Sequence, residues 1–66
     1  MNEQVKELLD RIIENTEQAH KARKKMLAAD KENNFDLAAT YRKEQHKYIA
    51  LLPTIEEIKK VRKLLD

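Results

Sequence analysis

The 66 residues make one small domain at most, with no Cys, no Gly, one Pro, 39% charged residues and a formal net charge of +2. The lack of Cys excludes disulfide bonds, thiolate metal sites and cysteine nucleophiles, and a core of this size rarely supplies more than roughly 3–5 kcal/mol of net stability. The net charge is too small to indicate nucleic-acid binding by itself. Because the chain consists almost wholly of helix-forming residues, we predict an all-α protein.

The first predicted element is one long helix over residues 3–32. Apolar or small residues recur along it in a 3-4 alternation that a single asparagine interrupts: Val5, Leu8, Ile12, Asn15, Ala19, Ala22, Met26 and Ala29. This spacing is typical of a helix with a coiled-coil-like seam. Leu9, Ile13 and Thr16 widen the apolar stripe in the first half of the helix.

Charge is segregated along this helix. Residues 1–18 carry two basic and five acidic groups, a net charge of −3. Residues 19–32 carry five basic and two acidic groups, a net charge of +3. Acidic groups near the start and basic groups near the end suit the helix dipole.

A turn at Asn33 and Asn34 is predicted to separate the first helix from a second helix over residues 35–52. Asn tolerates left-handed backbone angles where no Gly is available, and Asn34 suits the N-cap position with Asp36 in the first turn. The second helix has its own heptad-spaced seam, which consists of Ala38, Tyr41, Gln45, Tyr48 and Leu52.

Pro53 should end the second helix, because it lacks the backbone N–H that a helix interior needs. Thr54 and Glu57 have the spacing of a capping box, which predicts a third helix over residues 55–65. One face of this helix is expected to be buried: Ile55, Ile58, Val61 and Leu65.

The lengths predict an antiparallel helical hairpin, a single domain over residues 1–66, with a long first helix and a second arm broken at Pro53. At 1.5 Å per residue the first helix spans roughly 45 Å, nearly as much as the other two together. The third helix should lie on the stripe formed by Leu8, Leu9, Ile12 and Ile13. A homodimer of four-helix type is expected to cover the apolar residues that lie off the seam, namely Leu27, Leu37, Ile49, Leu51 and Leu64.

The segment NNFDLAATYRK, at residues 33–43, resembles the UVR motif, a helical hairpin of bacterial excision-repair proteins, of the middle domains of some Clp-type ATPases and of their regulators. That pattern runs Met, Ala, a short loop and then Asp-Phe-Glu-x-Ala-Ala-x-Leu-Arg-Asp. Within residues 22–50, Asn34, Phe35 and Asp36 stand where Asp-Phe-Glu is usual. The other matching residues are Met26, Ala29, Ala38, Ala39 and Arg42. Tyr41 replaces the leucine, and Lys43 reverses the charge of the last aspartate, so the family's partners do not transfer directly.

The resemblance implies a non-enzymatic protein–protein interaction module, an adaptor or regulator of a Clp-type quality-control ATPase or of excision repair. It assigns partner contacts to five residues: Phe35, Ala38, Ala39, Arg42 and Lys43. Packing is a second explanation for three of them, since Phe35 is expected to fold back on Met26 and Ala29 and close the hairpin tip, while the alanines allow a close approach of the helices. Without the resemblance, Arg42 is interpreted as a solvated surface residue.

Basic residues should gather along the turn half of the hairpin and form a patch: Lys21, Arg23, Lys24, Lys25 and Lys47. Salt screens exposed charges beyond about 8 Å, so the patch acts only on a partner that comes close. A solvated face is the first interpretation of this patch. A binding site for an acidic protein surface is the second, and a binding site for nucleic-acid phosphates is the third. A small basic nucleic-acid-associated protein is therefore the alternative function, although Tyr41 and Tyr48 fit the seam better than they fit base stacking.

No catalytic, cofactor or metal site is predicted. Glu17 and His20 have the Glu-x-x-His spacing of di-iron bundles, but the seam passes through Ala19 and Ala22 and leaves both side chains outside. The sequence has no Ser-His-Asp pattern and no Gly-rich phosphate loop. An enzyme whose active site is shared between subunits is a minor alternative.

We expect a cytoplasmic location and no membrane association. No apolar run approaches the roughly 20 residues that cross a bilayer, and the opening MNEQVKELLD does not have the pattern of a signal peptide. The third helix has basic residues opposite its apolar face, but it lacks the Trp or Phe of a membrane-surface anchor.

Overall fold

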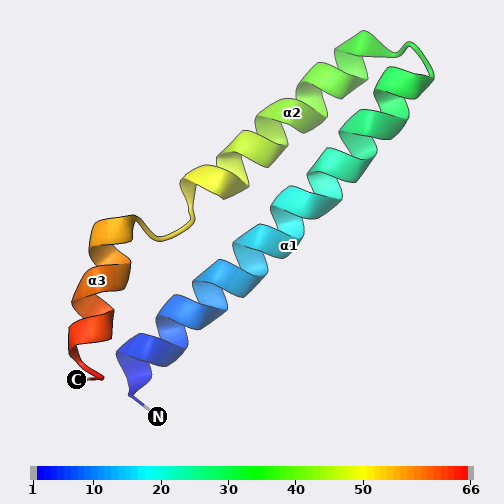
Figure 1. Cartoon of the computed structure of the whole chain (residues 1–66). Coiled ribbons are helices and arrows are strands. Elements are labelled where there is room, and N and C mark those ends of the chain that lie inside the picture. The colour runs from blue at the N-terminus through cyan, green and yellow to red at the C-terminus, as the bar shows by residue number, and fades with distance from the viewer. Residues whose placement is uncertain (1, 66) are drawn as a thin grey trace.

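The computed structural model describes residues 2–65, which form three helices: α1 (Glu3–Lys31), α2 (Phe35–Ala50) and α3 (Ile55–Lys63). Met1 and Asp66 lie outside the described residues. α1 and α2 run side by side in opposite directions, and α3 continues the second arm toward the start of α1 (Figure 1). The prediction of an all-α hairpin with a long first helix and a broken second arm is confirmed.

Each helix begins at a side chain that caps its first turn. The N-cap residues Asn2, Asn34 and Thr54 accept hydrogen bonds from backbone N–H groups two or three residues later, at 2.8, 3.3 and 3.2 Å. These bonds satisfy N–H groups that have no partner within the helix. Thr54 bonds to the N–H of Glu57, as the predicted capping box requires.

The turn between α1 and α2 depends on two asparagines. Asn33 has a φ of 61°, in the left-handed region that Asn tolerates better than most residues. Its N–H donates to the Asp30 carbonyl at 3.0 Å, and the N–H of Asn34 donates to the Ala29 carbonyl at 2.9 Å. The last carbonyls of α1 are thereby satisfied, which confirms the prediction that Asn serves here in place of Gly.

Phe35 does not close the hairpin tip, so the prediction of an aromatic plug is wrong. Its side chain is 66% exposed, whereas Ala29 and Ala38 are buried. Asn34, four positions before Ala38, continues the spacing of the seam, and Phe35 follows it as the first residue of α2, which places the ring beside the seam. The backbone hydrogen bonds of the turn and the two alanines close the tip without the ring.

The core is the seam between the two arms, and it consists largely of alanine. The buried apolar residues among those described are Val5, Ala19, Ala22, Ala29 and Ala38. The other predicted seam positions are half-buried: Leu8, Ile12, Asn15 and Met26 on α1, and Tyr41, Gln45, Tyr48 and Leu52 on the second arm. Small side chains let the helices approach closely, but each removes little apolar area from water.

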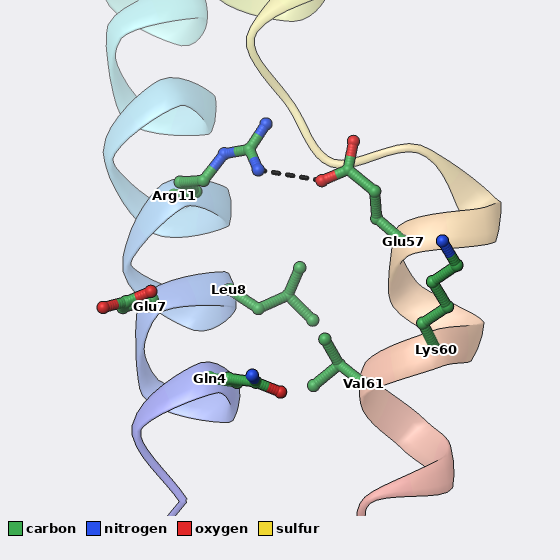
Figure 2. Close-up of a pocket in the computed structure, with 7 residues that line it drawn as sticks. All are labelled: Gln4, Glu7, Leu8, Arg11, Glu57, Lys60 and Val61. Carbon is green, nitrogen blue, oxygen red and sulfur yellow. Dashed lines mark hydrogen bonds and ion pairs between the residues drawn. The ribbon is translucent and has the colours of Figure 1, made fainter.

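α3 packs on α1 through a different face from the one predicted. Val61 is half-buried, but Ile55 is 72% exposed, and Ile58 and Leu65 are exposed as well. Figure 2 shows Val61 facing Leu8 across an open groove of about 310 Å³ between the two helices. The expected cover over Leu9 and Ile13 is absent, because both side chains are exposed in the structure.

The hairpin is one helix layer thick. It measures 50 × 19 × 12 Å, and its smallest extent is about the diameter of a single helix. The radius of gyration is 15.5 Å, against about 11 Å for a compact domain of this length. The accessible surface is 5560 Å², roughly 1,200 Å² more than a compact monomer of the same mass would expose.

Candidate functional site

Arg11 holds the bend between α2 and α3. Its Nη1 donates to Glu57 Oε2 at 2.8 Å (Figure 2). Its Nη2 donates to the Leu51 carbonyl at 3.2 Å. Leu51 is the C-cap of α2 and Glu57 lies in the first turn of α3, so one side chain of α1 binds both sides of Pro53. The sequence pattern did not indicate this role of Arg11. The one feature that distinguishes Arg11 in the sequence is that it is the only basic residue within residues 7–17.

The hydrogen bond from Arg11, and to a smaller extent one at Thr54, holds the pKa of Glu57 below the ordinary value of 4.5. A carboxylate with a lowered pKa stabilises the fold above its ordinary pKa, and this contribution is lost as the pH falls through the lowered value. Because both side chains are largely exposed, the ion pair orients α3 more than it adds stability.

In an Arg11→Gln variant, the pKa of Glu57 should rise toward its ordinary value, since the variant lacks the charged donor. An NMR titration of the Glu57 side-chain carboxyl carbon measures this directly. Arg62→Gln is the matched control, because Arg62 is an exposed arginine on α3 with no ion pair to Glu57 among the described residues. An identical Glu57 titration in wild type and Arg11→Gln would mean that the ion pair does not form in solution.

An uncovered, mainly apolar stripe runs along α1 beside the seam. Its five exposed residues, here called the α1 stripe, are three or four positions apart except between the last two, where the exposed Arg23 lies in the same row: Leu9, Ile13, Thr16, His20 and Leu27. Ile13 is 53% exposed. A shallow groove of about 330 Å³ lies at the middle of the stripe, between Ile12 and His20. The sequence pattern placed Leu9, Ile13 and Thr16 on the buried face. It did not identify the five residues as one exposed stripe.

Five residues of α2 lie on the same face of the hairpin as the α1 stripe. In two antiparallel helices, residues that follow a seam residue lie on one face of the hairpin, and residues that precede one lie on the other. Leu9 and Thr16 follow seam residues on α1. Four exposed residues follow seam residues on α2, and Phe35, four positions before Ala39, continues the same row: Phe35, Ala39, Arg42, His46 and Ile49. These five and the α1 stripe are together called the open face.

The five predicted contact residues occupy different environments. Phe35, Ala39 and Arg42 are exposed on the open face, and Lys43 is exposed on another side of α2. Ala38 is 2% exposed and packs in the seam of the closed hairpin. Its packing role is therefore the one that the structure shows, and the partner contacts stay a prediction.

The predicted basic patch is spread over exposed positions, and two of its lysines lie over tyrosines. Lys25 Nζ is 5.7 Å from the Tyr41 ring centroid, and Lys47 Nζ is 5.7 Å from that of Tyr48. Both distances allow a cation–π interaction. Both rings are half-buried in the seam, so neither presents an open face on which a base would stack. The other patch members, Lys21, Arg23 and Lys24, are exposed.

Glu17 and His20 both line the groove on α1, but this pair has no third ligand. Within residues 2–65, no group of three His, Asp or Glu side chains is arranged to hold a metal ion. In the same part of the chain, no helix is both long enough and apolar enough to span a bilayer.

The chain matches no protein-family model, no curated protein and no solved structure. The resemblance of residues 22–50 to the UVR motif therefore stays a prediction that rests on the residues quoted for it. The fold, the open face and the charge distribution are the observations from which a function is argued.

Proposed function

We propose that the protein is a non-enzymatic interaction module that docks helix-on-helix with other chains through its open face. One observation supports this most strongly: a chain of 66 residues exposes eleven large hydrophobic side chains among those described, and five of them lie on the open face. Scattered single exposures are normal, but several exposed apolar residues on one face beside a thin alanine core are typical of an interaction surface.

Homodimerisation is part of this proposal. A single core of this size is close to the limit of independent stability, and this one is made largely of alanine. Two hairpins that pack face to face make a four-helix arrangement, in which apolar residues of all four helices are buried between the helices. Association also stabilises the folded state by mass action, so part of the folding free energy would come from the second chain.

The resemblance to the UVR motif supports a more specific role, as an adaptor or regulator of a Clp-type quality-control ATPase or of excision repair. Such a role carries the expectation of a cytoplasmic location. Phe35 and Arg42 are both exposed on the open face, so both are accessible to a partner. Aromatic residues and Arg are enriched among the residues that contribute most to protein–protein binding.

A pull-down from a bacterial lysate, with the bound proteins identified by mass spectrometry, tests this role. Wild-type protein should enrich a Clp-type ATPase or an excision-repair protein. Arg42→Glu should weaken that binding about tenfold if Arg42 is a central contact. The same charge reversal at Arg62, on α3, should leave it unchanged. If Arg42→Glu retains every identified partner as well as wild type does, the UVR-type contact surface is not present.

The concentration of positive charge favours nucleic-acid association as the second candidate function. Residues 19–46 carry seven basic and four acidic groups, a net charge of +3. A nucleic-acid complex should weaken steeply as salt is added, with a slope set by the number of phosphate contacts. Fluorescence anisotropy of labelled DNA and RNA over a series of salt concentrations distinguishes this function from protein docking.

A further inference from the structure

We infer that the open face is covered by a second copy of this chain that lies tip to base against the first. The tip is the end with the Asn33–Asn34 turn, and the base is the end with the two termini (Figure 1). This arrangement rests on the proposed homodimer and specifies its face and its orientation. Three observations carry it: the uncovered area, the symmetry of the fold and the distribution of charge.

The uncovered area matches what a second hairpin would bury. The chain exposes roughly 1,200 Å² more surface than a compact monomer of its mass, from a total of 5560 Å². A stable protein–protein interface buries about 800 Å² on each partner. The hairpin is 50 Å long and one layer thick, so a second copy of equal length can cover the open face from end to end.

Two symmetric arrangements place open face against open face. A two-fold axis along the hairpin sets tip against tip and places α1 over α2 of the second copy. A two-fold axis across the hairpin sets tip against base and places α1 antiparallel over α1 of the second copy. Both are closed dimers in which each copy uses the same surface, and both form four helices.

Charge distinguishes the two arrangements. The tip half, residues 19–46, has a net charge of +3. The remaining residues, 1–18 and 47–66, carry seven basic and eight acidic groups, a net charge of −1. A tip-to-tip dimer places two positive halves together, whereas a tip-to-base dimer places each positive half against a negative one. Opposite potentials across an interface select register and orientation.

The segregated charge of α1 favours the same orientation. In the tip-to-base dimer, residues 1–18 of one copy, with a net charge of −3, lie along residues 19–32 of the other copy, with a net charge of +3. With the two-fold axis near Gln18, Leu9 faces Leu27 of the second copy, and Thr16 faces His20 of the second copy. The ends of the α1 stripe are therefore paired with each other, leucine against leucine, and its two polar members meet at the centre. Between them, Ile13 lies against Arg23 of the second copy.

Spin labels at two matched sites test the orientation. The chain has no Cys, so Lys21→Cys and Ala28→Cys each carry a single label. Both residues are exposed and lie seven residues, two turns, apart on the same side of α1. Along the helix axis, a tip-to-base dimer separates the two labels at position 21 by roughly 9 Å and those at position 28 by roughly 30 Å.

Pulsed electron spin resonance on each singly labelled dimer should therefore give a clearly longer distance at position 28 than at position 21. Dilution with excess unlabelled chain should remove both distances, because they join two copies. Equal distances at the two positions would overturn the tip-to-base orientation and leave the homodimer intact. The absence of any intermolecular distance at either position would overturn the homodimer as well.

Discussion

Leu27→Asp is expected to convert the dimer into a monomer. Leu27 lies at one end of the α1 stripe and is 51% exposed in the single hairpin, so an aspartate there is solvated in the monomer. In the tip-to-base dimer the same carboxylate would be buried against Leu9 of the second copy, which costs several kcal/mol for each ion. A two-fold interface contains the substitution twice. The dissociation constant should rise by more than about 100-fold, roughly 3 kcal/mol.

Gln18→Asp is the matched control for this substitution. It introduces the same charge on the same helix, but Gln18 is exposed and precedes Ala19 as Arg11 precedes Ile12, which places it on the opposite face. Its dissociation constant should stay within about threefold of wild type, as expected of a surface substitution. Sedimentation equilibrium measures both variants. If Leu27→Asp dimerises as well as Gln18→Asp does, the α1 stripe is not in the interface.

Ala38→Leu should destabilise the fold by about 1–3 kcal/mol, because the added methylenes have no space in the seam. Ala38 is 2% exposed and lies in the seam between the two arms, in the first turn of α2. The core of so small a domain rarely supplies more than roughly 3–5 kcal/mol. The variant should therefore be partly unfolded at 37 °C, or unfold at a much lower denaturant concentration than wild type.

Ala39→Leu is the control at the adjacent position. Ala39 is exposed on α2, so the same added side chain meets solvent, and stability should stay within about 0.5 kcal/mol of wild type. Denaturant unfolding followed by circular dichroism, over the same series of protein concentrations for both variants, separates a loss of hairpin stability from a change in dimerisation. Equal loss of stability in the two variants would mean that Ala38 does not occupy a tightly packed seam.

The local features of the fold were predictable from the sequence. The seam of α1 is correct at each of its eight positions, because a 3-4 spacing places residues on one face whatever covers it. The turn and the capping box were also predictable, because Asn33 and Thr54 act through backbone groups only a few residues away.

The features that depend on distant contacts were not predictable. Ile55 is exposed because α3 turns Glu57 and Val61 toward α1, and this rotation accompanies an ion pair between residues 46 positions apart. Phe35 was expected to be buried because it is large, apolar and close to the turn, but the turn is closed by its own backbone hydrogen bonds. Spacing identifies an apolar face but does not identify what covers it.

Only part of the candidate site follows from the sequence in the same way. Arg42 was expected to be exposed, and it is, whereas Ala38 and Ala39 were treated as a pair and lie on different sides of α2. Neighbouring residues on a helix are about 100° apart, so one alanine of the pair faces the seam and the other faces solvent. The α1 stripe became visible only when the position of the second arm was known.

Sedimentation equilibrium of the wild-type chain over a wide range of concentrations tests most directly whether a second copy completes the hairpin. We expect the average mass to rise from the monomer value of 7.8 kDa toward twice that value, and the melting temperature to rise over the same range. A mass of 7.8 kDa at every concentration, with a melting temperature that does not change, would show that the single hairpin is stable with its open face uncovered.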